Sequence, residues 1–189
     1  MPGAFKAWMF NWKASRARSR PDRILQTLMP RAGERVMDYG AGGGYFAMRL
    51  AEFVGQEGRV YAVDINPAFL KYIRKKAAKR GLRGLETLTP EEVGSRVPEA
   101  SLDLIFMRNV THHIEDRSAL FTKFAPLLKP GGRVAIVEHL PGRGHSPEHS
   151  VPPETLISEM ESAGFALTNT HDFLPDQSFM IFIRRSREG

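Results

Sequence analysis

The sequence predicts an α/β protein with a doubly wound, largely parallel sheet. Short apolar runs alternate with amphipathic stretches along the 189 residues, which is typical of strands that alternate with helices. The run Arg35–Tyr39 leads into four glycines within five residues and then into an amphipathic stretch, the pattern of strand, tight turn and helix. The run Ser101–Met107 is almost continuously apolar, as in strands buried on both faces. These observations favour an open sheet over a barrel.

The apolar runs and the turn residues between them predict seven strands. Their expected ranges are 35–39, 59–64, 85–88, 101–107, 133–138, 165–171 and 178–184. Helices are expected from Pro21 to Pro30, from the glycine turn to Val54, from Pro67 to Gly81, at 116–128 and at 153–163. Residues 89–100 carry no clear pattern, and the last two strands form a hairpin. The proline-rich stretch 140–152 is a loop long enough to be functional.

Length and composition bound the class of protein. We expect a single domain with a full core at residues 21–189, and 42% hydrophobic with 25% charged residues is typical of soluble globular proteins. No apolar run approaches the ~18–20 residues of a membrane span. The absence of cysteine excludes disulfides, thiolate metal sites and thiol nucleophiles, and the expected compartment is cytoplasmic. The sequence carries no signal of oligomeric state.

Two stretches concentrate the positive charge. Residues 1–20 and 71–83 hold twelve basic residues and no acid, so a net charge of +6 divides into +12 there and −6 elsewhere. Nucleic acid and anionic lipid are partners for such patches, but a solvated helix face with a basic tail is favoured over both. Within residues 1–20, Phe5, Trp8 and Trp12 share one helical face. We interpret this segment as a lid over a ligand site, as a surface that contacts a membrane or an apolar substrate, or as a frayed terminus.

An acid ends each of the first two predicted strands. Asp38 precedes the glycine turn, and Asp64 lies twenty residues past Gly44. An acid about one βα unit beyond a glycine turn suits the two hydroxyls of a ribose. A glycine cluster alone would indicate only a tight turn. The combination favours a ligand that contains a ribose.

Four motifs in order carry a resemblance to a known family. Residues 36–44 read acid-x-G-x-G-x-G after a strand, and residues 63–65 end the second strand in an acid. Residues 104–113 are a strand followed by a His-His turn, and residues 127–133 contain Leu-Lys-Pro-Gly-Gly before the fifth strand. Over residues 22–184 the chain resembles the class I S-adenosylmethionine-dependent methyltransferases, particularly the group related to the ubiquinone/menaquinone-biosynthesis methylases.

The resemblance implies a Rossmann-like, seven-stranded sheet of order 3-2-1-4-5-7-6, with only strand 7 antiparallel and helices on both faces. It implies S-adenosyl-L-methionine as cofactor and S-adenosyl-L-homocysteine as product. The glycines would admit the methionine portion, Asp38 would hold the amino-acid end, Asp64 the ribose hydroxyls, and Ile65 would pack on the adenine. The cofactor-binding residues that it implies are Asp38, Gly40, Ala41, Gly42, Gly44, Asp64, Ile65 and Asn109.

One segment departs from the family pattern. Members often place an Asp after the third strand, near the adenine amino group, where this chain reads Thr87-Leu88-Thr89-Pro90-Glu91-Glu92. Thr89 and Glu91 are the candidates for that contact.

Methyl transfer from a sulfonium needs in-line alignment, and it needs a general base only when the acceptor must lose a proton. The catalytic candidates are His112 and His113 after the fourth strand, and the alternative is one packed histidine and one in a polar turn. Glu138, which ends the fifth strand, is expected to be a satisfied surface acid, and the alternative is contact with a substrate. His145 and His149 have metal-ligand spacing, but the proline between them disfavours a helix that presents both, so we predict no metal site.

We therefore predict an enzyme that transfers a methyl group to a small, partly hydrophobic acceptor, with RNA and protein acceptors less favoured. A protein that binds the cofactor without turnover is the first alternative. An NAD-dependent oxidoreductase is the second, because Gly42–Ala47 satisfies G-x-G-x-x-A. Asp38 argues against it, since a carboxylate there would lie near the pyrophosphate charge.

Overall fold

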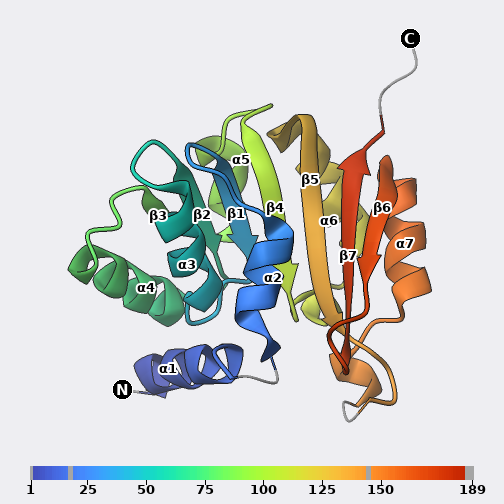
Figure 1. The fold of residues 1–189 in the computed structure, drawn as a ribbon, viewed down its shortest axis with the longest axis horizontal. Coiled ribbons are helices and arrows are strands. Elements are labelled where there is room, and N and C mark those ends of the chain that lie inside the picture. Colours follow the sequence, from blue (N-terminus) through green and yellow to red (C-terminus); the bar gives the residue numbers. More distant parts are fainter. Residues whose placement is uncertain (1, 17–18, 144–145, 186–189) are drawn as a thin grey trace. The chain divides into compact units, whose positions relative to one another are not determined.

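The computed structural model describes residues 2–16, 19–143 and 146–185. Its seven strands are hydrogen-bonded in the order β3-β2-β1-β4-β5-β7-β6, with helices around the sheet (Figure 1). The strands are β1 Arg35–Tyr39, β2 Arg59–Val63, β3 Leu85–Leu88, β4 Leu102–Arg108, β5 Leu128–His139, β6 Phe165–His171 and β7 Gln177–Arg184. The predicted fold class is confirmed. The chain divides into two compact units, residues 1–97 and 98–189, and each is described by itself.

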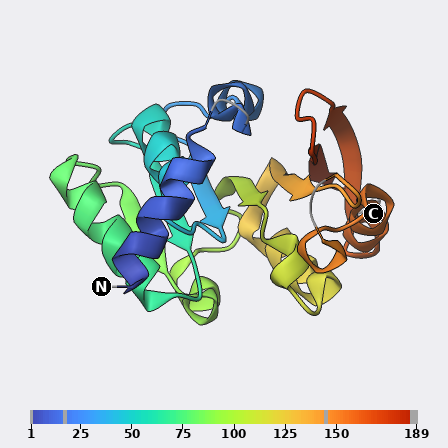
Figure 2. The same ribbon diagram turned by 90° about the horizontal axis from the view of Figure 1, so that it is seen from below.

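The first unit contains three parallel strands, with Val60 paired to Val36 on β1 and to Leu85 on β3. Its core forms because the apolar residues of α3 recur at helical spacing and pack against β1 and β2. Helix α1 lies beside α4, as Figures 1 and 2 both show. The helical elements are α1 Pro2–Ala14, α2 Pro21–Leu28, α3 Tyr45–Val54, α4 Pro67–Lys79, η2 Pro90–Glu92 and α5 Val93–Arg96.

The second unit contains a parallel pair, β4 and β5, and an antiparallel strand, β7, that pairs with both β5 and β6. The β6–β7 hairpin is the one that the sequence predicts. Fully buried phenylalanines, among them Phe106, Phe121 and Phe165, fill the core of this unit. The helical elements are η3 Thr111–His113, α6 Arg117–Phe124, η4 Ala125–Leu127, η5 Pro147–His149 and α7 Pro153–Ser162.

Two expected boundaries differ from the structure by more than two residues. The helix expected at 116–128 ends at Phe124, because Pro126 lacks an N–H and the chain tightens into the 3₁₀ turn η4. The fifth strand begins at Leu128 rather than Arg133, since Leu128 already pairs with Leu102 before a shift in register. The stretch 89–100, for which the sequence predicts no element, contains η2 and α5. A capping box at Thr89 begins η2.

Candidate functional site

The glycine turn joins β1 to α3 in the first unit. Gly40, Gly42 and Gly44 have φ angles of 82°, 54° and 78°, a backbone region that residues with a Cβ rarely adopt. The N–H groups of Gly40 and Ala41 donate to the carbonyl oxygen of Val63 at 2.8 and 2.9 Å. The turn is therefore anchored to the end of β2.

Both predicted acids of this unit lie at the turn. Asp38 is buried on β1, two residues before Gly40. Asp64 accepts two backbone hydrogen bonds, from Gly42 N to Oδ2 at 2.8 Å and from Asn66 N to Oδ1 at 2.8 Å. Burial raises the pKa of Asp64, and these two bonds oppose that rise in part. Asp64 thus ties the end of β2 to the glycine turn, and each of its oxygens keeps a lone pair for a further donor.

Ile65 presents its side chain to solvent beside Asp64, with 82% of the residue exposed. The chain turns away directly after it, because Asn66 caps α4 by accepting a hydrogen bond from Ala68 N at 3.0 Å. Pro67 occupies the first helical position, which suits its fixed φ. The cap leaves a large aliphatic side chain outside the core, next to the acid expected at a ribose.

Helix α1 packs directly on the glycine turn. A Cβ at Gly43 would lie 2.2 Å from the carbonyl oxygen of Ala7 and 2.4 Å from Asn11 Oδ1, so only glycine permits this approach. Asn11 Oδ1 is buried and has no hydrogen-bond partner among the described residues. The sequence interpretation missed Asn11. The available signal was the stripe of Gly3, Ala7 and Ala14, small residues that share its helical face.

The segment after β3 is hydrogen-bonded to itself. The N–H of Thr89 donates to Glu92 Oε2 at 2.8 Å, and the Thr89 hydroxyl accepts from the N–H of Glu92, which makes a capping box. The hydroxyl of Thr89 also holds the pKa of the exposed Glu91 below its usual value. Thr89 and Glu91, the two candidates for the adenine contact, are therefore hydrogen-bonded to each other.

In the second unit, Asn109 follows β4 in the left-handed backbone region, with φ 52°. Asparagine tolerates this region better than most residues. Its N–H donates to the carbonyl oxygen of Val137 at 2.8 Å, and its side-chain oxygen accepts from Nε2 of the buried Gln177. Gln177 is a supporting residue that the sequence interpretation also missed.

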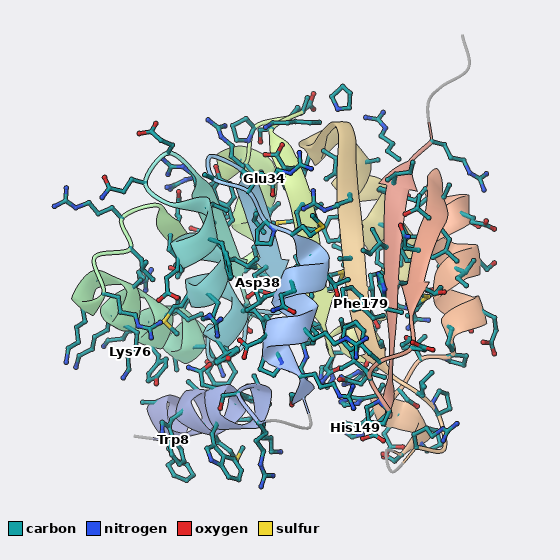
Figure 3. The ribbon with its side chains drawn as sticks, in the orientation of Figure 1. Trp8, Glu34, Asp38, Lys76, His149 and Phe179 are labelled. Carbon is teal, nitrogen blue, oxygen red and sulfur yellow. The ribbon has the colours of Figure 1, made fainter. Side chains whose placement is uncertain are left out.

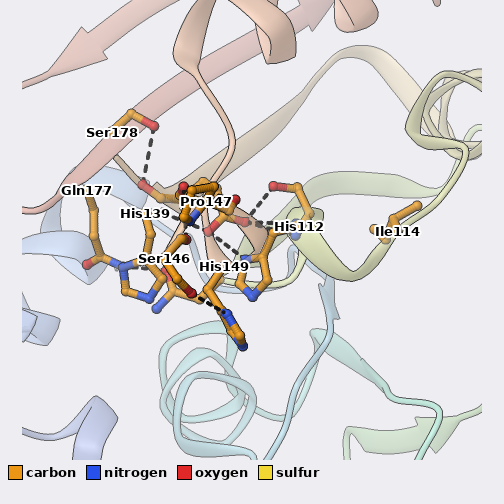
Figure 4. A network of polar contacts seen from close by, with 12 residues as sticks. His112, Ile114, His139, Ser146, Pro147, His149, Gln177 and Ser178 are labelled. Carbon is orange, nitrogen blue, oxygen red and sulfur yellow. Dashed lines mark hydrogen bonds and ion pairs between the residues drawn. The ribbon is translucent and has the colours of Figure 1, made fainter. Parts of the chain in front are cut away.

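Glu138 is the centre of a polar network at the end of β5 (Figure 4). Its Oε2 accepts from the N–H and hydroxyl of Thr111 at 3.0 and 2.5 Å. Its Oε1 lies 2.9 Å from His112 Nδ1 and accepts from His139 N at 2.7 Å. The expectation of a surface acid is wrong, because Glu138 is fully buried. Donors from η3 replace the water that a buried carboxylate would otherwise need.

The hydrogen bonds to Glu138 decide the protonation of this network. Burial would raise the pKa of Glu138, but the bonds from His112, Thr111 and His139 outweigh it and lower that pKa. An ionised carboxylate can only accept, so the proton of the 2.9 Å contact lies on His112 Nδ1. In the neutral ring, Nε2 is then the proton acceptor.

The predicted histidines gather around this carboxylate. His112 is almost buried, whereas His113 is exposed. The ring centroids of His112 and His113 are 4.1 Å apart, and the ring of His149 on η5 lies 5.7 Å from that of His112. Of the two catalytic candidates, it is His112 that contacts Glu138.

Neither a group of metal ligands nor a helix able to span a membrane occurs within residues 2–16, 19–143 and 146–185. No three histidine, aspartate or glutamate side chains there are arranged to hold a metal ion. His145 lies outside the described residues, and His149 Nδ1 contacts the Ser146 hydroxyl at 3.0 Å. None of the helices in this part of the chain combines the length and the apolar character that crossing a membrane requires.

A sheet of this order, with a glycine turn after β1 and an acid after β2, defines the class of S-adenosylmethionine-dependent methyltransferases. A family model described as a methyltransferase domain matches residues 30–170, and the chain belongs to that family.

Individual methyltransferases are similar to this chain in sequence or in fold. Aklanonic acid methyltransferase DauC of Streptomyces sp. (strain C5) is 32% identical over 132 residues, or 70% of this chain and 59% of DauC. The C-methyltransferase UbiE of ubiquinone/menaquinone biosynthesis from Marinomonas sp. (strain MWYL1) is 31% identical over 109 residues, or 57% of this chain and 43% of UbiE. A crystal structure of a methyltransferase from Aquifex aeolicus matches with a TM-score of 0.77 and 25% identity, over 86% of this chain and 88% of that one. The chain spans about half the length of the curated relatives it matches.

The residues of the first unit fit the cofactor of this class. A Cβ at Gly42 would have its nearest neighbour, Phe10 Cβ, 4.0 Å away, so the backbone is open at that point. Asp64 offers acceptors for hydroxyl groups, and Ile65 offers an exposed apolar surface for a base. An open backbone suits the methionine portion of this cofactor, and the other two features suit its ribose and its base.

Proposed function

We propose that this chain binds S-adenosylmethionine and transfers its methyl group to a small, partly hydrophobic acceptor. The observation that carries the proposal is the hydrogen bond from Gly42 N to Asp64 Oδ2, at 2.8 Å. It brings a carboxylate suited to ribose hydroxyls against a turn whose backbone is open to a ligand.

The proposed cofactor contacts follow from this arrangement. Asp64 accepts the ribose hydroxyls, Ile65 packs on the adenine, and Asp38 holds the ammonium of the methionine portion directly or through water. Asn109 is a further proposed contact. The glycine turn, with Gly40, Ala41, Gly42 and Gly44, lets the backbone approach the ligand closely.

We also propose that residues 1–20 form a lid on a single methyltransferase domain over residues 21–189. The packing of α1 on Gly43 supports this role. The buried oxygen of Asn11 supports it as well, because a donor on a ligand would supply the hydrogen bond that it lacks among the described residues.

S-adenosylmethionine, held by the glycine turn, Asp38, Asp64 and Ile65, would supply an electrophilic methyl group on a sulfonium. The protein contributes alignment, which in model systems is worth roughly 7–11 kcal/mol. For an acceptor that must lose a proton, His112 Nε2 is the proposed base. Glu138 orients the His112 ring and stabilises its protonated form.

The proposed acceptor is a small molecule, and DauC is named for one, aklanonic acid. RNA and protein acceptors are less favoured. The proposed compartment is the cytoplasm, which the absence of cysteine favours.

Calorimetric titration with S-adenosylmethionine, S-adenosylhomocysteine and NAD tests the cofactor. The two adenosyl ligands are expected to bind with micromolar affinity and NAD is not. Asp64→Asn keeps a carbonyl oxygen for the Gly42 bond but removes the charge, and Ile65→Ser removes an exposed apolar surface. Both are expected to weaken binding at least tenfold. Ile183→Ser, another exposed isoleucine, is the matched control.

The outcomes separate the alternatives. Binding of NAD alone would overturn the proposal in favour of an oxidoreductase. Binding of S-adenosylmethionine that Asp64→Asn and Ile65→Ser leave unchanged would overturn the assigned site. Binding without methyl transfer to any of a panel of phenols, carboxylic acids and amines would favour the non-catalytic alternative.

A further inference from the structure

Helix α1 turns its small residues toward the protein and its large apolar residues toward solvent. Gly3 packs so closely on α4 that a Cβ there would lie 2.5 Å from Ala68 Cβ, and Ala7 touches Gly43. Phe5, Trp8 and Trp12 are 66%, 52% and 47% exposed. An ordinary surface helix has the opposite orientation. In Figure 3 the Trp8 side chain points away from the rest of the unit.

The outward side chains lie on one face of the helix in two contacting pairs. The rings of Phe5 and Trp8 are 5.8 Å apart, and the guanidinium of Arg16 lies 4.1 Å above the ring of Trp12. Lys6 and Lys13 share one flank of the helix, two turns apart. Aromatic side chains beside a basic flank have the composition of helices that lie in the interface of a membrane.

The neighbouring helix α4 extends this surface with positive charge. Its side that meets α1 is identified by Ala68, which contacts Gly3, and by Phe69, whose ring lies 5.7 Å from that of Phe10. Lys75, Lys76 and Lys79 follow Ala68 by about two or three turns and so share this side. Figure 3 shows Lys76 on the side of α4 nearer α1. No acid occurs in residues 71–83 to neutralise this charge.

We propose that α1 and the adjoining side of α4 dock on an anionic phospholipid surface. The indole and phenyl rings of α1 enter the boundary between headgroups and acyl chains, and the lysines and arginines of both helices contact lipid phosphates. Nucleic acid fits less well, because the outermost positions of α1 are apolar rings whereas phosphate contacts need charges there. A second copy of the chain fits less well, because the basic surfaces would repel each other.

Both tryptophans of the chain are on α1, so tryptophan fluorescence, excited where tyrosine does not absorb, reports on this helix alone. The full-length protein is titrated with vesicles of phosphatidylcholine and with vesicles of equimolar phosphatidylcholine and phosphatidylglycerol. The anionic vesicles are expected to shift the emission to shorter wavelength, and brominated acyl chains are expected to quench it. Added salt should weaken the binding, since screening acts on the lysines.

Variants then separate the apolar and the charged parts of the surface by vesicle co-sedimentation. Trp8→Ser with Trp12→Ser is expected to abolish binding, whereas Phe53→Ser, an equally exposed aromatic on α3, is the control that should not change it. Lys75→Glu with Lys79→Glu should lower the partition coefficient by at least fivefold per lysine, roughly the contribution of one basic residue near an anionic surface. Lys123→Glu on α6 is the charge control.

Unchanged fluorescence with anionic vesicles would overturn the proposal. So would binding that the tryptophan and lysine variants leave intact, since another surface would then be responsible. A fluorescence shift with a mixed RNA oligonucleotide but not with vesicles would assign the surface to nucleic acid. A shift with protein concentration alone would assign it to self-association.

Discussion

The carbonyl oxygen of Ala7 lies where a side chain on Gly43 would begin, 2.2 Å from the position of a Cβ. The N-terminal helix and the glycine turn therefore pack as one layer, with no side chain of the turn between them. Any shift of the turn at Gly43 must also move α1.

Gly43→Ala tests this contact. The φ of Gly43 is not in the left-handed region, so the added methyl acts through its clash with the α1 backbone and not through backbone strain. We expect a loss of about 1–3 kcal/mol in the free energy of unfolding, or release of α1, as for other overpacked sites. Urea unfolding and limited proteolysis near residues 15–20 would measure the two effects. Gly94→Ala in α5, where a Cβ meets nothing within 4 Å, is the control and should be neutral or slightly stabilising.

Glu138→Gln tests the buried network. The folded-state pKa of Glu138 is lowered from its ordinary value of 4.5, so the ionised side chain stabilises the fold above pH 4.5. This contribution is lost as the pH falls through the folded-state pKa. We expect the variant to be about 2 kcal/mol less stable at neutral pH, the range of hydrogen bonds to a charged group.

The difference in unfolding free energy between wild type and Glu138→Gln should shrink on acidification, which urea unfolding across a pH series would show. Glu99→Gln, an exposed glutamate, should show no such effect. A difference that stayed constant from neutral to acid pH would mean that shape rather than charge stabilises the network.

Asp64→Asn should have the opposite pH dependence. Burial raises the folded-state pKa of Asp64 above 3.8, so the folded protein holds that proton more tightly than the unfolded chain does. The associated stability is present below pH 3.8 and is lost as the pH rises through the raised pKa. As the pH rises through the raised pKa, the variant should therefore gain stability relative to wild type. Its affinity for S-adenosylhomocysteine should be lower than that of wild type. Thermal unfolding at several pH values, with and without the ligand, measures both effects. A gain in the stability of wild type relative to the variant, as the pH rises above 3.8, would contradict the prediction.

Arg117→Lys tests a pairing between α6 and α7. Arg117 Nε and Nη2 each donate to a different oxygen of Glu159 at 2.7 Å, and both side chains are largely buried. Lysine cannot reproduce this two-pronged contact, so we expect a loss of about 1 kcal/mol in the free energy of unfolding. Arg59→Lys is the control, because Arg59 makes a single 3.4 Å contact with Glu86 at an exposed site. Equal losses in unfolding free energy for the two substitutions would show that the two-pronged contact with Glu159 does not stabilise the fold.

Much of the fold was predictable because its signals are local. The predicted bounds of Arg35–Tyr39, Leu85–Leu88 and Phe165–His171 agree with the structure, since strand periodicity and flanking turn residues are written in a few consecutive positions. The strand order came from the resemblance, which places four motifs in sequence. The predicted start of the fifth strand is wrong. The strand begins at Leu128, which pairs across a register shift that no local pattern records.

The sequence by itself determined the strands, the glycine turn and Asp64 with its neighbour Ile65, because backbone conformation and apolar spacing act over a few residues. Only the tertiary structure decided that Glu138 is buried, because its side-chain donors come from η3, 26 and 27 residues earlier in the chain. It also decided which face of α1 packs. The helix could present either stripe, and the close approach to Gly43 selects the small residues, which leaves Trp8 and Trp12 outside.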